Sequence, residues 1–300
     1  MKLRAWFSFA ACGAGLLLSG CGGSAPASPA PVAPAVSALA GNWLIAGPMP
    51  TNGFNESPGF RLALTFDVTG NNVTASGFGS NSCSNAESSF GFGSLATGTI
   101  AADGSFSLQT PSSFPDLAMS IQGNVPKVTG SPWVGSYTVS LAPPRVPVTC
   151  DTNVTGTFTA TPFPLVSGVY AGTGTTSAIV NGVLTTSPIA FQVTLHQGGT
   201  VTNPVTGTSL SSNSALSGSI RVQGSPCFTS GVTGVMPPSE VEGNQVVANF
   251  MMDDGSTLSI LGSITDATET RIMTHVATVI GGQCGTVPSI YQLPELDLQS

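Results

Sequence analysis

Two stretches, 62-LALTFDVTG-70 and 189-IAFQVTLHQ-197, decide the fold because they repeat one pattern of side chains. In both, apolar residues occupy every second position, and the residues between them are largely polar. A period of two indicates a β-strand with one buried face. The matching apolar positions, 127 residues apart, are Leu62/Ile189, Leu64/Phe191, Phe66/Val193 and Val68/Leu195.

Further landmarks recur in the same order along the chain. The offset of 127 also aligns Trp43 with Tyr170. The offsets between later landmarks differ from 127 only by amounts that insertions between the landmarks explain. We therefore predict two tandem β domains, 39–164 and 165–300. A jump in offset before Cys227 predicts an enlarged loop in the second copy, at 199–214. The later landmarks are Cys83/Cys227, Met119–Gly123/Leu258–Gly262 and Cys150/Cys284.

The first copy contains about eight short candidate strands separated by turn sequences, and neither copy shows a sustained helical period. Eight antiparallel strands form either a small closed barrel or a sandwich, so we predict an all-β fold of one of these two kinds. The expected strands lie near 42–46, 61–69, 72–78, 95–101, 104–109, 117–123, 133–141 and 155–161.

The N-terminus carries export and anchoring signals. Lys2 and Arg4 precede an apolar run, 5–18, that is too short to span a bilayer but fits a secretory signal. The run ends in Leu18-Ser19-Gly20-Cys21, which resembles the lipobox of bacterial exported lipoproteins. That resemblance implies cleavage before Cys21, acylation of Cys21 with fatty acids such as palmitate, and, because Gly22 is not aspartate, anchoring in the outer membrane.

We accordingly interpret 1–20 as a signal peptide and 21–38 as the lipidated cysteine with a linker rich in Pro, Ala and Ser. Such a linker favours extended conformations. Just beyond it, Gly41-Asn42-Trp43 resembles the Gly-x-Trp opening of lipocalins, although the second copy has Tyr170 in place of the tryptophan. This resemblance implies a barrel that carries a small apolar ligand.

The cysteines divide evenly between the copies once Cys12 is removed with the signal peptide and Cys21 is assigned to the lipid. Because an exported protein favours disulfides, we predict one bond in each domain, Cys83–Cys150 and Cys227–Cys284, with cross-domain pairing as the alternative. No Cys-x2-Cys or Cys/His cluster suggests a metal, and we predict no cofactor.

Few side chains are charged, and most of these are acidic. Without the signal peptide, five basic and 14 acidic residues remain, a net charge near −9. An acidic chain argues against nucleic acid as a partner. The predicted partners are therefore the membrane, through the lipidated N-terminus, and an envelope protein or a small apolar ligand.

Residues suited to catalysis are scarce. His196 lies on the polar face of its strand, and His275 lies in a strand whose buried face is unclear. Glu240 and Glu242 follow two prolines in a predicted loop, and Asp253-Asp254-Gly255 is typical of a β-turn. No predicted catalytic residue emerges from this set.

The sequence thus supports three hypotheses. The first is a non-enzymatic, lipid-anchored envelope protein that presents two β domains for structural or protein-interaction roles. The second is a lipocalin-like carrier of a small apolar ligand, which requires a cavity inside a barrel. The third is a hydrolase of envelope material, which requires His196 or His275 beside a serine or carboxylate in a cleft.

Overall fold

The computed structural model of the chain confirms the all-β prediction. In the described residues the chain forms strands and turns, with a single 3-10 helix, η1 (Val36–Leu39). Across the same residues, no helix is long and apolar enough to span a membrane. The described ranges are 36–47, 60–80, 94–110, 117–141, 153–180, 183–202, 207, 209–233, 239–266, 271–282, 289–292 and 295–299.

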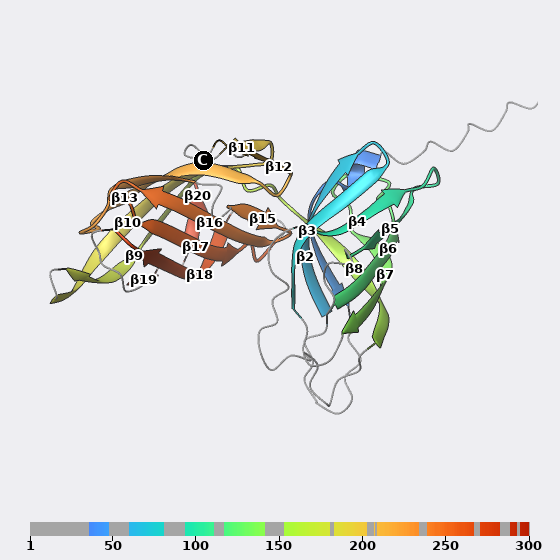
Figure 1. Cartoon of the computed structure of the whole chain (residues 1–300), viewed down its shortest axis with the longest axis horizontal. Helices are drawn as coiled ribbons and strands as arrows, with labels where there is room; N and C mark the ends of the chain where they lie inside the picture. Colours follow the sequence, from blue (N-terminus) through green and yellow to red (C-terminus); the bar gives the residue numbers. More distant parts are fainter. Residues whose placement is uncertain are drawn as a thin grey trace, which may run out of the picture. The chain divides into compact units, whose positions relative to one another are not determined.

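The first copy is a closed antiparallel barrel, here called barrel 1 (Figure 1). Its strands pair in sequence order, and β8 pairs back with β1, which settles the choice between barrel and sandwich. All eight predicted strands are present. They are β1 (Gly41–Gly47), β2 (Phe60–Thr69), β3 (Asn72–Ser80), β4 (Ser94–Ile100), β5 (Ser105–Gln109), β6 (Leu117–Asn124), β7 (Trp133–Leu141) and β8 (Asn153–Phe163).

The second copy, barrel 2, also closes on itself, because β9 pairs with β10 on one side and with β19 and β20 on the other. The short strands β19 and β20 share one place between β18 and β9, so the ring has the same eight places as barrel 1. The ring strands are β9 (Gly168–Val180), β10 (Val183–Gln197), β13 (Leu216–Gln223), β14 (Ser230–Thr233), β16 (Gln245–Met252), β17 (Thr257–Ser263), β18 (Arg271–Ile280), β19 (Ser289–Gln292) and β20 (Glu295–Leu298).

The repeated pattern of 62–70 and 189–197 lies on β2 and β10. Phe66 and Leu64 are fully buried, and Phe191 and Val193 are 2% and 1% exposed. The later landmarks also coincide, because 119–123 lies on β6 and 258–262 on β17, the sixth ring strand of each barrel. Ala33–Ser300 is one compact unit that contains both barrels, so the predicted division into domains at 164/165 stays a prediction.

Aromatic rings fill the interior of barrel 1. Trp133 packs edge-to-face against Trp43, Phe66, Phe106 and Phe158, at centroid distances of 5.2 to 6.3 Å. Such contacts stabilise a core beyond the burial of area alone.

Glycines on the barrel wall make room for these rings. A Cβ at Gly135 would lie 2.6 Å from the Phe158 ring, and one at Gly123 would lie 2.7 Å from Trp133. The large aromatic rings therefore pack against wall positions that are occupied by glycine.

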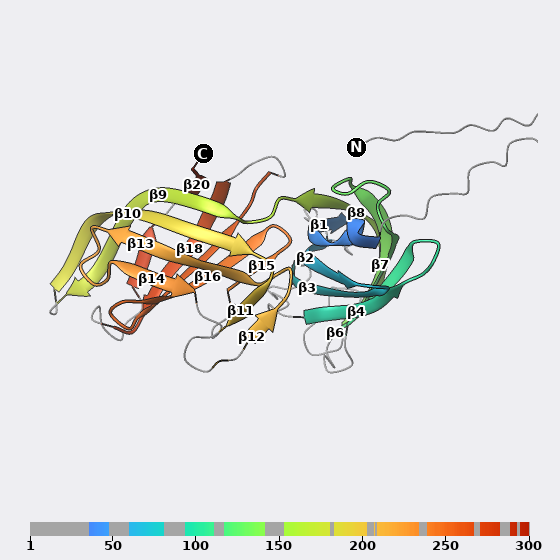
Figure 2. The ribbon, with the colours of Figure 1, turned by 90° about the horizontal axis from the view of Figure 1, so that it is seen from above.

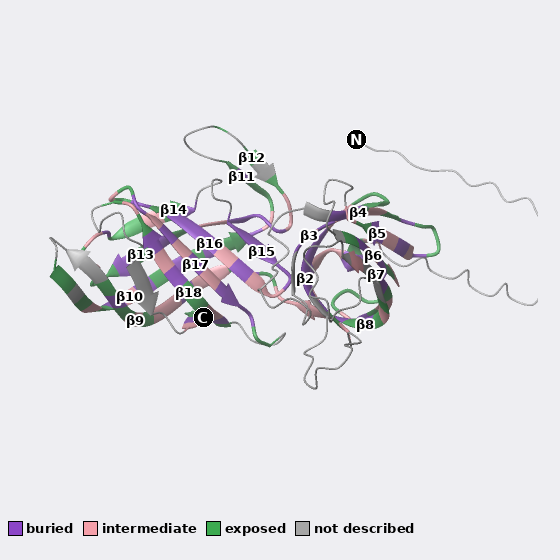
Figure 3. Ribbon diagram, turned by 60° about the horizontal axis from the view of Figure 1, so that its bottom comes forward, coloured by how far each residue is buried: buried purple, intermediate pink, exposed green. Residues whose placement is uncertain are grey.

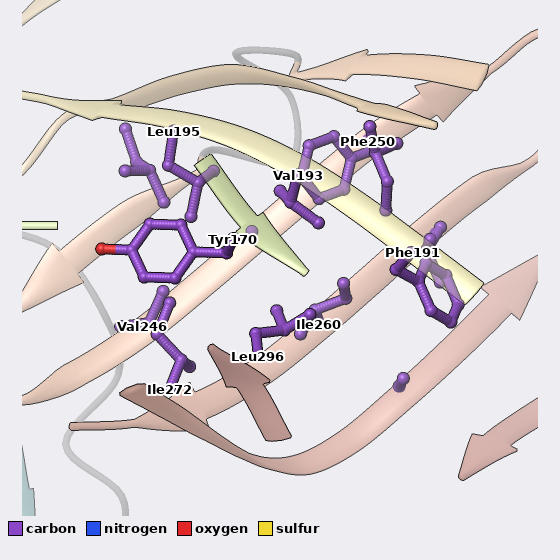
Figure 4. Packing of buried hydrophobic residues seen from close by; sticks show 14 of the residues in the cluster. Tyr170, Phe191, Val193, Leu195, Val246, Phe250, Ile260, Ile272 and Leu296 are labelled. Carbon is purple, nitrogen blue, oxygen red and sulfur yellow. The ribbon is translucent and has the colours of Figure 1, made fainter. Parts of the chain in front are cut away.

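Barrel 2 has a more aliphatic interior. Tyr170 and Phe250 belong to one buried cluster, in which Tyr170 lies among Leu195, Val246 and Ile272 (Figure 4). Buried and exposed residues alternate along its strands (Figure 3), as a barrel with one inward face requires.

Three sequence predictions need correction. The linker predicted at 21–38 ends earlier, because η1 begins at Val36 and buries Ala38 and Leu39; the Leu39 carbonyl accepts the Trp43 indole N–H at 2.8 Å. The outward face of β2 is not solvent-exposed, because Thr65 and Ala63 are 0% and 4% exposed. The predicted loop with Glu240 and Glu242 is the buried strand β15 (Glu240–Glu242).

Two insertions specific to barrel 2 cover the outward face of β2. The first is the predicted enlarged loop, which forms a hairpin of β11 (Thr200–Thr202) and β12 (Ser209–Ser211) (Figure 2). Just after it, the Asn213 backbone N–H and the Ser212 hydroxyl donate to Asp67 at 2.7 and 2.8 Å. The second insertion contains β15, and just after that strand Gly243 donates its N–H to the Thr65 hydroxyl at 3.1 Å.

A buried amide pair lies beside these contacts. The Asn42 side-chain amide donates to Gln197 Oε1 at 3.0 Å, and the Gln197 amide donates back to Asn42 Oδ1 at 2.7 Å. Both side chains are almost fully buried. We call the contacts of Asn42, Thr65 and Asp67 with barrel 2 the junction. Because its polar groups are hydrogen-bonded, burying them carries little penalty.

Candidate binding surface

The predicted modification sites lie mostly outside the described residues. Cys21 does so, and its acylation stays a prediction. Cys227 is disulfide-bonded. The pairing itself stays a prediction, because Cys83, Cys150 and Cys284 lie outside the described ranges.

The two histidines differ in their surroundings. His196 is an exposed residue of β10, as the strand pattern predicts. His275 is the extra residue of a β-bulge, where the register of β17 against β18 shifts after Leu261. Its Nε2 lies 2.8 Å from the Ser263 hydroxyl. Bulges often redirect side chains at functional sites, so this contact bears on the hydrolase hypothesis.

The acidic residues do not assemble into a metal site. Within the described ranges, no three His, Cys, Asp or Glu side chains lie together as metal ligands would. Asp253 and Asp254 lie in the turn between β16 and β17, as predicted. Burial raises the pKa of Glu240, which lies in β15 rather than facing a second carboxylate across a cleft.

A different site emerges on the outside of barrel 1. One uncharged polar side chain from each of five adjacent strands points outward at the same level, each directly opposite the next in the register. Cross-strand partners share one face of a sheet. We call this set the polar row; it is Thr99, Ser107, Gln122, Ser136 and Thr157.

The polar row lies in a concave surface of about 1000 Å³. Among the described residues that line it, none is Asp, Glu, Lys or Arg. Asn124 and Thr159 add polar groups beside the row, while Val134, which is 70% exposed, and Ala46 add small apolar patches. A second row of uncharged polar residues runs parallel to the polar row, two residues away along each strand. Its members are Thr97, Gln109, Ser120, Thr138 and Thr155.

The same place on barrel 2 is apolar. The register there aligns Val247 with Leu261 and Leu261 with Val276, and this set is the apolar row. It is the equivalent of Ser107, Gln122 and Ser136, since Gln122 and Leu261 both precede the glycine of the repeated motif. The polar row is therefore a property of one copy and not of the fold.

The sequence alone does not predict this surface. Ser, Thr and Gln that alternate with apolar residues are typical of the outward face of a single strand. However, which residues become neighbours depends on the register between strands, and register is set by the whole barrel.

Comparison with known proteins identifies no relative by sequence. The chain matches no family profile and no curated protein. Among solved structures, it is similar to kievitone hydratase from Nectria haematococca at 9% identity, over 88% of this chain and 90% of that one, with a TM-score of 0.23. At that TM-score the similarity carries no argument about fold or activity.

Proposed function

We propose that this chain is a non-enzymatic protein of the bacterial cell envelope that binds a partner on the outer surface of its barrels. The observation that carries the proposal is the filled interior of barrel 1, where Trp43, Leu64, Phe66 and Tyr137 are 0–2% exposed. Small eight-stranded barrels either fill their interior with side chains or hold a ligand there. A filled interior disfavours the carrier hypothesis and leaves the outer surface for recognition.

A fluorescent apolar probe tests this choice. The purified mature chain is titrated with 1-anilinonaphthalene-8-sulfonate and with a fluorescent fatty acid. We expect no saturable binding, because the side chains of each core already pack against one another. Binding of one probe per barrel, competed by unlabelled fatty acid, would instead establish the carrier.

We further propose that the protein is held at the outer membrane by lipid on Cys21. The support is the order of basic residues, apolar run and Leu18-Ser19-Gly20-Cys21 in the sequence. Several acyl chains on one residue give stable anchoring, whereas one chain is marginal. Cys21→Ala should move the protein from the membrane to the soluble fraction. Unchanged membrane retention, with no lipid mass on the mature N-terminus, would contradict the anchor.

The contact between Ser263 and His275 is the observation that favours the hydrolase hypothesis. A histidine base can activate a serine, but it also needs a group that orients it. A fluorophosphonate probe tests the serine directly. We expect no labelling, whereas labelling abolished by both Ser263→Ala and His275→Ala would establish the hydrolase.

A further inference from the structure

We infer that the concave polar face of barrel 1 binds a neutral, extended glycan chain that lies across the strands along the polar row. This inference rests on the proposed function, since it names the partner of the outer surface. It is carried by the register, the lack of charge and the free hydrogen-bonding capacity of the row.

The side chains of the polar row are not used by the protein itself. Over the described residues, none of the five takes part in a side-chain hydrogen bond with another protein group. The second row is different, because at its level on barrel 2 the Ser259 hydroxyl donates to Asn249 Oδ1 at 2.6 Å. The polar row thus offers unused donors and acceptors to a ligand.

The absence of charge among the described lining residues argues against several partners. Nucleic acids and anionic headgroups are bound by Lys and Arg, and the lining has neither within the described ranges. An extended peptide would add to a free strand edge, but β4–β8 each pair with neighbours on both sides. An apolar ligand would leave the row's amide and hydroxyl groups without partners.

A glycan suits the same features. Each sugar hydroxyl both donates and accepts, as the hydroxyls of Thr99 and Ser136 and the amide of Gln122 do. Val134 and Ala46 offer apolar surface to the C–H faces of the rings. Neighbouring strands lie about 4.8 Å apart, which is close to the rise of one sugar in an extended β-1,4-linked chain. A chain across five strands would therefore place about one sugar over each.

Calorimetric titration of the full mature chain tests the inference. The probes are cellobiose, cellotetraose, cellohexaose and N-acetylchitohexaose, with maltohexaose as the curved, differently linked control. We expect affinity to rise at least tenfold from disaccharide to hexasaccharide, and maltohexaose to bind more weakly than cellohexaose. Failure of both extended hexasaccharides to bind would overturn the inference.

A matched pair of variants localises the binding. Gln122→Leu copies the barrel 2 residue onto the polar row and should weaken hexasaccharide binding about tenfold or more by removing several hydrogen bonds. Leu261→Gln is the reverse exchange on barrel 2 and should leave binding unchanged. Equal effects of the two variants would contradict the inference.

The titration with apolar probes distinguishes a failure of the glycan inference from a failure of the proposed function. If no glycan binds and the apolar probes also do not bind, the glycan inference is wrong while the outer-surface function stands. If the apolar probes bind inside a barrel, the proposed function itself is wrong.

Discussion

The polar row of barrel 1 and the apolar row of barrel 2 occupy the same place on two copies of one barrel. The inward residues next to these rows are alike in the two barrels. Ile121 precedes Gln122 in barrel 1 and Ile260 precedes Leu261 in barrel 2, and both isoleucines are almost fully buried. Outward residues differ, with Gln122 facing solvent in one copy and Leu261 in the other. The comparison teaches that burial fixes the inward positions, so differences in function between the copies are to be sought outside.

The largest expected effect tests whether the two cores are equally essential. Phe158→Ala in barrel 1 removes a ring that packs against Trp133 and over Gly135, and it should lower the free energy of unfolding by about 3–5 kcal/mol. Phe250→Ala in barrel 2, at a fully buried position, should cost about the same. Urea unfolding followed by far-ultraviolet circular dichroism measures both. A loss in the free energy of unfolding below about 1 kcal/mol for either variant would show that the two cores are not equally essential.

The next effect tests the close contact between Gly243 of barrel 2 and the outward face of β1 and β2 in barrel 1. Gly243 has a φ of +58°, and a Cβ there would lie 2.4 Å from the Trp43 carbonyl oxygen and 2.7 Å from the Ala63 Cα. Because these are backbone atoms, Gly243→Ala should cost about 2–5 kcal/mol, combining a left-handed backbone with overpacking.

Gly255→Ala is the matched control for Gly243→Ala. Gly255 also has a positive φ, of +83°, but a Cβ there meets nothing within 4 Å. Its cost should be about 1–2 kcal/mol, from the backbone alone. Equal costs for the two variants, measured by urea unfolding, would show that the close approach at Gly243 does not matter.

A smaller effect concerns the buried amide pair. Asn42→Ala leaves the Gln197 amide buried without its reciprocal partner, so it should cost about 1–3 kcal/mol. Gln192→Ala, an exposed position of the same strand as Gln197, should lie within about 0.5 kcal/mol of the parent. A double-mutant cycle with Gln197→Ala should show strong coupling, and additive costs would mean that the pair contributes little.

The smallest effect is a pH dependence. Burial raises the pKa of Glu240 above its value in the unfolded chain. Its stabilising contribution is therefore complete below the unfolded pKa and is lost as pH rises through the folded pKa. Glu240→Gln should raise Tm at pH 7, with a gain that shrinks toward pH 4.

Asp103→Asn supplies a control of opposite sign. Hydrogen bonds from the Ser105 side chain and backbone lower the pKa of Asp103, so the carboxylate stabilises the fold above the unfolded pKa and less as pH falls. The variant should lower Tm slightly at pH 7 and have less effect at acid pH. Thermal scans from pH 4 to 8 compare the two, and the same sign for both would contradict these assignments.

Much of the fold follows from the sequence, because alternation along one strand is local information. The pattern in 62–70 and 189–197 gives both the strand type and the duplication, and the eight strands of barrel 1 appear near their expected positions. Pro162 marks the end of β8 closely for a physical reason. At that level the strand pairs with β1 alone, where a missing N–H is tolerated.

The remaining features depend on contacts between residues far apart in the chain. Thr65 has the alternation of an exposed polar residue, yet it is buried by β15, some 176 residues later. Glu240 and Glu242 follow prolines, as loop residues do, yet pairing with β16 makes them a strand. The polar row needs the register of five strands at once, and no single stretch contains it.

The distribution of tryptophan has a spectroscopic consequence. Of the chain's three tryptophans, Trp6 lies in the predicted signal peptide, and Trp43 and Trp133 both lie in the core of barrel 1. The tryptophan fluorescence of the mature protein would then report on one barrel, while its circular dichroism reports on both. Without any added label, a difference between the two signals during unfolding would reveal whether the barrels lose their structure together or in turn.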